Sequence, residues 1–180
     1  MKTNYQNQSK MNPALSLTII AMVIAFRLAL SYIPSFKFGS YAEIGVGFIG
    51  AALAAVLLGP WRAAGVGAVV DILSFFLTGG GLFFPGYTLS AALGGLLYGL
   101  MLYKKEPSFL RVLVTVSLVT LIINLGLGSL WIHLLYGKAF EVFMGVRIIK
   151  NLISWPINTL VLYLLLNNDN VKRIINKYRL

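Results

Sequence analysis

Two cations and an amide lie close together near the start of the last long apolar stretch of the chain. Arg147, Lys150 and Asn151 are three and four residues apart, so on a helix Arg147 shares a face with both of the others. Guanidinium and ammonium groups attract carboxylates, and arginine can bind one with two parallel hydrogen bonds. We therefore interpret this face as a candidate site for a ligand that carries carboxylates.

Aromatic and polar side chains accompany these cations. Trp131 and His133 lie in the preceding apolar stretch, and Trp155 lies one helical turn beyond Asn151. Their rings can stack on a planar ligand or form hydrogen bonds with it. A belt of aromatic residues at a membrane interface would explain both tryptophans without a ligand, but it would leave the cations unexplained.

A glycine-rich segment, TGGGLFFPGYT at residues 78–88, is the third candidate. We expect an ordered or hinged loop, because three consecutive glycines and Pro85 disfavour a helix. Glycines let a ligand approach the backbone, while Phe84, Tyr87 and Thr88 offer rings and a hydroxyl. A flexible connector would have a similar composition, so the motif alone leaves both interpretations open.

Two opposite charges fall inside apolar stretches. Arg27 lies about two-thirds of the way along the first stretch, and Asp71 lies in the later half of the third. A lone charge in the middle of a membrane helix costs at least about 2.5 kcal/mol, so both side chains should face the protein interior. They can form a buried ion pair that fixes helix register, or they can contact a ligand directly.

Other chemistries lack the residues that they need. The chain has no cysteine and one histidine, which excludes thiolate sites and disfavours a histidine-built metal site. No two carboxylates have an acid–base or metal-binding spacing within one helix, and no Walker-type nucleotide loop is present. We therefore predict no enzyme activity, no metal and no cofactor, and any use of ATP must come from a partner.

The composition indicates the environment of the chain. Hydrophobic residues make up 58% of the 180 residues and charged residues 11%, whereas soluble domains average roughly 25% charged residues. A membrane-spanning helix needs about 20 apolar residues. The pattern predicts an all-α, polytopic membrane protein, a single membrane domain over residues 1–180 with six transmembrane helices at 13–33, 44–58, 61–77, 89–103, 110–135 and 146–166.

Local signals add detail to this outline. We expect a loop at Ser35 to Glu43 and a basic tail after the sixth helix. The centre of the fifth helix contains Asn124, Gly126 and Gly128, which should bend or unwind it.

The distribution of charge predicts the topology. The net charge of +10 comes mainly from cations in short connections between apolar stretches, which argues against nucleic-acid binding. Ten of these cations fall on the side that holds the N-terminus and four on the other, so both termini should be cytoplasmic. The first apolar stretch is longer than a signal-peptide core and lacks a cleavage motif, so we expect a multi-pass protein of the cell membrane that keeps this helix and contacts lipid.

Small residues recur in the first helix. Ala21, Ala25 and Ala29 are four residues apart, which lets another helix approach closely. The chain shares this alanine element and the glycine-rich segment with the substrate-binding S components of energy-coupling factor (ECF) vitamin transporters. It resembles them over nearly its full length, and most of all it resembles the folate-specific type. The motifs that carry the resemblance are FFPGYTLSAALGGLLYGL at 83–100, LWIHLLYGKAF at 130–140 and RIIKNLISWPINT at 147–159.

This resemblance implies high-affinity capture of folate from outside the cell. It also implies delivery through a shared transmembrane coupling subunit, driven by two ATPase subunits, with the alanine face of the first helix docked on the shared subunit. Thiamine, riboflavin or a precursor is the alternative ligand. A structural membrane subunit without a ligand of its own is the alternative from another class.

Folate would give the candidate residues distinct roles, because it joins a flat pterin and a benzoyl ring to a glutamate with two carboxylates. Arg147 and Lys150, with Lys138, would attract the glutamate, and Asp71 would accept hydrogen bonds from the pterin. The stacking candidates are Phe84, Tyr87, Trp131 and Trp155, and the further candidate ligand-binding residues are Arg27, Thr88, His133 and Asn151.

Overall fold

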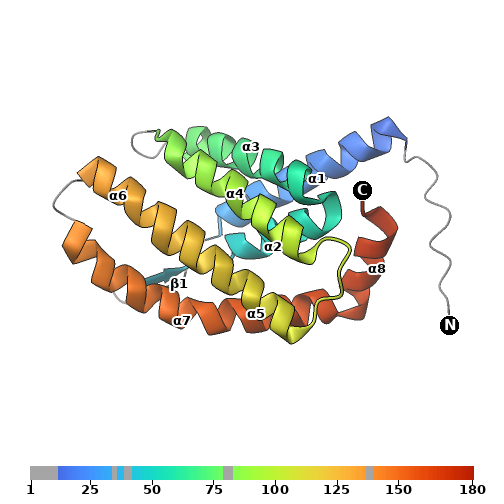
Figure 1. Cartoon of the computed structure of the whole chain (residues 1–180). Coiled ribbons are helices and arrows are strands. Elements are labelled where there is room, and N and C mark those ends of the chain that lie inside the picture. The colour runs from blue at the N-terminus through green and yellow to red at the C-terminus, as the bar shows by residue number, and fades with distance from the viewer. Residues whose placement is uncertain (1–11, 34–35, 39–41, 79–82, 137–139) are drawn as a thin grey trace.

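The chain folds mainly into long helices that lie side by side (Figure 1). The computed structural model describes residues 12–33, 36–38, 42–78, 83–136 and 140–180. The elements are α1 (Pro13–Ser31), β1 (Phe36–Phe38), β2 (Ala42–Ile44), α2 (Gly47–Leu58), α3 (Pro60–Thr78), α4 (Pro85–Leu102), α5 (Phe109–Leu118), the π-helix η1 (Val119–Leu127), α6 (Gly128–Tyr136), α7 (Phe140–Asn167) and α8 (Asp169–Tyr178). The predicted all-α class is confirmed, with one small hairpin added.

Four of the described helical segments are long and apolar enough to cross a membrane. They are Pro13–Ser31, Pro60–Leu77, Phe109–Leu135 and Arg147–Asn167. All six predicted apolar helices are present, but α2 has 12 residues and is therefore only about 18 Å long. It cannot cross a bilayer core of about 30 Å by itself.

A short antiparallel hairpin replaces part of the predicted loop between the first two helices. Phe36 pairs with Ile44, and Phe38 pairs with Ala42. The prediction that the second helix begins at Ile44 is therefore wrong, because Ile44 belongs to β2 and α2 begins at Gly47. A three-residue strand is too short to show a clear alternating pattern in the sequence.

The fourth helix begins four residues earlier than predicted. Pro85 occupies its first turn, where its fixed φ suits a helix and its missing N–H costs nothing. Tyr87 and Thr88 thus lie on a helix rather than in a loop. The three consecutive glycines, 79–81, lie outside the described residues.

The predicted irregularity of the fifth helix is a π-helical stretch. Residues Val119–Leu127 are π-helical and include Asn124 and Gly126, and Gly128 begins α6. The chain continues as one rod from α5 through η1 into α6 (Figure 1). Single π-helical turns within α-helices are frequent at functional sites.

The sixth helix is longer than predicted, and the predicted basic tail is a helix. α7 extends over Phe140–Asn167 and keeps Pro156 in its interior, which a helix packed among neighbours tolerates. After it, the Asn168 side chain accepts hydrogen bonds from the N–H groups of Asn170 and Val171 and so caps α8.

Small residues bring α3 and α4 into backbone contact. Gly67 lies against the main chain of Ala91, and Gly95 lies against the main chain of Ala63. Glycine at these positions leaves room for close approach, as in other membrane helix pairs. The two helices are antiparallel neighbours over most of their length (Figure 1), and their register depends on these contacts.

The variant Gly95→Ala tests this packing, with Gly94→Ala as its neighbour control. A Cβ at position 95 would lie 2.8 Å from the carbonyl carbon of Ala63, and such overpacking costs about 1–3 kcal/mol. A Cβ at position 94 meets no heavy atom within 4 Å, so alanine there should be neutral or stabilising by up to about 1 kcal/mol. Denaturant unfolding in detergent measures both changes, and equal effects would contradict the contact between Gly95 and Ala63.

Candidate functional site

The Asp71 carboxylate on α3 accepts a hydrogen bond from a hydroxyl on α4. Thr88 Oγ1 donates to Asp71 Oδ2 over 2.7 Å, and both side chains are partly buried. The earlier start of α4 makes this contact possible, because it places Thr88 in the first turn of the helix. A hydrogen bond to a carboxylate is worth about 1.5–3 kcal/mol and orients the group.

Arg27 approaches Asp71 without pairing with it. The Asp71 charge acts on the Arg27 guanidinium, but the two described side chains form no ion pair, and Arg27 Nη1 is buried without a hydrogen-bond partner. The guanidinium stem is wedged against α2, since a Cβ at Gly50 would lie 3.0 Å from Arg27 Cγ. A buried donor with no acceptor has free capacity to hydrogen-bond.

Three rings from α6 and the start of α4 form an aromatic cluster, which consists of Phe84, Tyr87 and Trp131. The Phe84 ring centroid lies 5.5 Å from that of Trp131 and 5.9 Å from that of Tyr87, both edge to face. Trp131 Nε1 donates to Ser90 Oγ over 2.8 Å. Gly86 lies beneath the rings, because a Cβ there would come within 2.7 Å of Trp131 Cδ2. The cluster is therefore tightly packed on its inner side, while Tyr87 remains 40% exposed.

Arg147 reaches from α7 to the irregular rod. Its Nη2 donates to the main-chain oxygen of Asn124 over 2.8 Å. The guanidinium lies against Gly128, where a Cβ would be 3.3 Å from Arg147 Cζ. The Tyr87 side chain lies near it, and Arg147 Nε is buried without a partner. This cation is thus held beside the aromatic cluster with donor capacity to spare.

The other predicted site residues have different surroundings. The Asn151 amide donates to the main-chain oxygen of Arg147 over 2.8 Å and so braces α7. Lys150 is partly buried, and His133 is exposed. Trp155 donates from Nε1 to Ser117 Oγ over 2.9 Å and packs against the main core. Lys138 lies outside the described residues.

The positions of the elements bring most of these groups to one end of the molecule. Figure 1 shows the start of α4, the end of α6 and the start of α7 at one end, with α8 at the other. Asp71 with Thr88, the aromatic cluster and Arg147 therefore occupy neighbouring elements at one end. Together they offer a carboxylate acceptor, ring faces and a cation.

Sequence reasoning missed Ser90, Gly86 and Gly128. Ser90 is 9% exposed and fixes the Trp131 ring, and it lies one helical turn after Gly86. A helix that began at Pro85 would have placed both on one face, so the signal was present in the sequence. The contact between Gly128 and Arg147 joins residues far apart in the sequence and left no local signal.

The three alanines of α1 lie on its outward face. Ala21, Ala25 and Ala29 are all exposed, and so are the neighbouring Met22 and Phe26. The opposite face of α1 packs on α2 and α3 through a cluster of buried residues that includes Ile19 and Val23. The alanine face is therefore free to contact lipid or another helix.

A family model decides the class of this protein. Residues 15–166 match the model described as ECF transporter, substrate-specific component. The chain belongs to this family. The predicted resemblance is confirmed, and with its apolar helices this ECF component is a multi-pass membrane protein.

Relatives of this ECF component carry a more specific name. A protein of Clostridium novyi (strain NT), named folate transporter FolT, is 40% identical over 121 residues, which are 67% of this chain and 70% of the relative. A second folate transporter FolT, from Leuconostoc mesenteroides subsp. mesenteroides, is 33% identical over 165 residues, 88% of each chain. A crystal structure of FolT bound with folic acid is similar with a TM-score of 0.79 and 33% identity, covering 86% of this chain and 95% of that chain.

The contact between Gly128 and Arg147 can be tested with a double-mutant cycle. Gly128→Ala should lower the free energy of unfolding by about 1–3 kcal/mol, because the added methyl group displaces the guanidinium. In the Arg147→Ala background the same change should cost far less, a coupling of about 0.5–3 kcal/mol. Denaturant unfolding of the four proteins measures the cycle, and additive effects would show that the two residues do not touch.

Proposed function

We propose that this ECF component captures folate from outside the cell for ATP-driven uptake. The observation that carries the proposal is the likeness over most of the chain to a FolT structure bound with folic acid, at 33% identity. Two relatives named folate transporter FolT support the same ligand. The chemistry of the candidate site fits it as well.

Folate has two ends that need different partners. The pterin presents amino and ring N–H donors, which a carboxylate accepts well. We assign this role to Asp71, which Thr88 holds in place over 2.7 Å. Arg27 lies behind it with an unused donor and completes the polar part of this end of the site.

The glutamate end needs cations. We assign it to Arg147, with Lys150 and His133 as further polar contacts and Asn151 as the residue that braces the helix beneath. A guanidinium already anchored by one hydrogen bond keeps its remaining donors in a fixed direction. This pre-organisation lowers the entropic cost of binding.

The aromatic cluster would stack on the flat rings of the ligand. Phe84 and Trp131 are fixed edge to face, and the Trp131 hydrogen bond to Ser90 prevents rotation of the indole. Tyr87 is the most exposed of the three and is the ring of the cluster nearest in effect to Arg147. Trp155 would offer a further ring face from the side of the main core. Its indole is held there by the hydrogen bond to Ser117.

Transport needs partners that this chain does not contain. A shared transmembrane coupling subunit and two ATPase subunits would provide the path and the energy, as expected for the family. The exposed alanine face of α1 is suited to docking, because small residues let a partner helix approach closely.

With both termini in the cytoplasm, the candidate site would face outward. We expect no catalytic activity from this chain.

Binding of folate and of pteroic acid, which lacks the glutamate, tests the role of Arg147. The variant Arg147→Gln should weaken folate binding about 10- to 100-fold, because a charged hydrogen bond is lost. Pteroic acid binding should change far less. Equilibrium titration of the purified protein in detergent measures both ligands.

Arg173→Gln is the matched control, because it removes the same charge from an exposed position on α8. It should leave both affinities unchanged. Equal losses for folate and pteroic acid in Arg147→Gln would exclude a contact between Arg147 and the glutamate. Equal competition by thiamine or riboflavin would overturn the folate assignment itself.

Asp71→Asn tests the other end of the ligand. If Asp71 accepts from the pterin, this variant weakens folate and pteroic acid alike, by about tenfold or more, since both contain the pterin. Asp169→Asn, which removes a carboxylate from the exposed first turn of α8, is the control. The same titrations measure the effect, and a loss confined to folate would exclude a contact between Asp71 and the pterin.

A further inference from the structure

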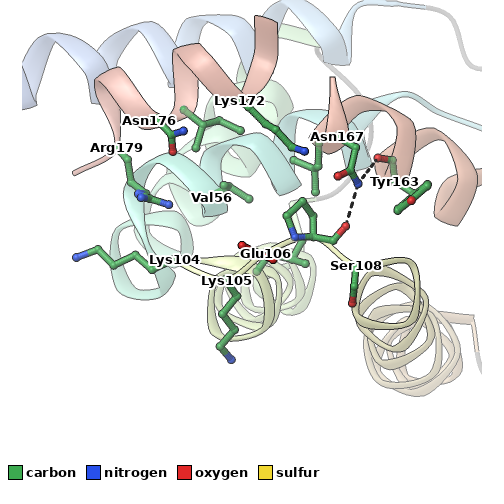
Figure 2. Close-up of a pocket in the computed structure, with 14 residues that line it drawn as sticks. Val56, Lys104, Lys105, Glu106, Ser108, Tyr163, Asn167, Lys172, Asn176 and Arg179 are labelled. Carbon is green, nitrogen blue, oxygen red and sulfur yellow. Dashed lines mark hydrogen bonds between the residues drawn. The ribbon is translucent and has the colours of Figure 1, made fainter. Parts of the chain in front are cut away.

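A pocket of about 810 Å³ lies at the end of the bundle opposite the candidate site. It opens between α8, the end of α7 and the connection from α4 to α5 (Figure 2). Its walls combine apolar side chains with four cations and one carboxylate. The lining residues that bear on its chemistry are Leu102, Lys104, Lys105, Glu106, Lys172 and Arg179.

The helix α8 is fixed against the bundle and so gives the pocket a rigid wall. Val171 and Ile175 pack into the main core, and Ile175 is 6% exposed. Beyond the helix, the Leu180 N–H donates to the Leu57 main-chain oxygen over 2.8 Å, and the Tyr103 hydroxyl donates to the Leu180 main-chain oxygen. Side chains on the pocket face of α8 are therefore held in place.

The helix α8 and the residue that follows it contribute three polar side chains to the lining of the pocket. Lys172 and Asn176 are four residues apart and share a face of α8, and Arg179 follows directly after the helix ends at Tyr178. Figure 2 shows them extending from α8 above the connection that carries Glu106. Two cations and an amide thus line one pocket.

These two cations have no partner in the described part of the chain. Arg179 Nε is buried without a hydrogen-bond acceptor, and neither Lys172 nor Arg179 forms an ion pair with Glu106. The other two cations are already engaged, because Lys105 Nζ donates to the Leu100 main-chain oxygen over 2.7 Å and Lys104 Nζ lies 5.2 Å from the Tyr103 ring centroid. An anion between Lys172 and Arg179 would satisfy donors that the protein leaves unpaired.

The position of the pocket indicates which kind of anion is present around it. It lies where the membrane-crossing segment of α7 ends, and α8 exposes Ile174 and Tyr178 beside it. Apolar groups and tyrosine on such a helix favour the headgroup region of a bilayer. Basic pockets at the ends of membrane helices bind anionic lipid headgroups, and arginine matches the geometry of phosphate.

We propose that Lys172 and Arg179 bind a phosphate group in this pocket, supplied by an anionic phospholipid headgroup or by soluble phosphate. Asn176 and Asn167 supply further amide groups at its edge. The apolar walls beside the cations suit the start of an acyl chain. The site is separate from the candidate folate site and does not depend on it.

Native mass spectrometry of the delipidated protein in neutral detergent tests the proposal. Wild type should bind phosphatidylglycerol about tenfold more tightly than phosphatidylcholine, and the double variant Lys172→Gln/Arg179→Gln should lose this preference. The control Arg173→Gln/Lys177→Gln removes two cations from exposed positions of the same helix and should keep it. Helical circular dichroism and size-exclusion elution confirm that each variant is folded.

A second arm separates the two sources of phosphate. Inorganic phosphate is added without lipid, and the thermal unfolding of wild type and both double variants is compared. Stabilisation of wild type and the control, but not of the pocket variant, would also support the site and identify soluble phosphate as a ligand. Equal lipid preference in all three proteins, or equal loss in both double variants, would overturn the proposal, because either result means diffuse attraction to the surface.

Discussion

The backbone contact between α3 and α4 is the constraint on which the site depends. Pro60 meets Gly99, Ala63 meets Gly95 and Gly67 meets Ala91, so the antiparallel helices touch once every turn. The next turn brings Asp71 to Thr88, at 2.7 Å. The carboxylate that we assign to the pterin is thus positioned by three contacts of small residues below it. A shift in register by one residue would turn Thr88 away from Asp71.

The remaining site groups are attached to this helix pair through α4. Phe84, Tyr87 and Ser90 lie in the turns around the beginning of α4, and Trp131 and Arg147 reach them from α6 and α7. The hydrogen bonds of Asp71 with Thr88 and of Trp131 with Ser90 are partly buried, which strengthens them. The unpaired donors on Arg27 and Arg147 are consistent with a site that is completed by a polar ligand.

The sequence predicted where the apolar helices lie, because long apolar stretches are the signal of membrane helices, but only four of the described helical segments are long and apolar enough to cross a membrane. It also located the irregular centre of the fifth helix, since Asn124 and Gly126 are poor helix formers. The start of α4 was wrong because Pro85 was treated as a helix breaker, although proline suits a first turn. The polar helix α8 was predicted as a basic tail because of its charged residues. Its apolar residues nevertheless recur at helical spacing on one face.

Contacts between distant segments could not be predicted from the chain. Nothing near Ser90 in the sequence indicates that it accepts from Trp131, and nothing near Gly128 indicates the approach of Arg147. Both pairs depend on how three helices pack, and packing is settled by shape over the whole bundle. The residue types of the site were therefore predictable, but their partners were not.

The π-helical stretch gives the rod from α5 to α6 two halves that can change independently. Each residue of an α-helix turns the chain by about 100°, so an insertion or deletion within Val119–Leu127 that the π-helical turns do not absorb would rotate α6 by that angle. The α5 half, with Val112 and Val116 fully packed in the core, would keep its neighbours. Length variation at this one point offers evolution a way to exchange the side chains that α6 presents, and thus the ligand, without rebuilding the fold.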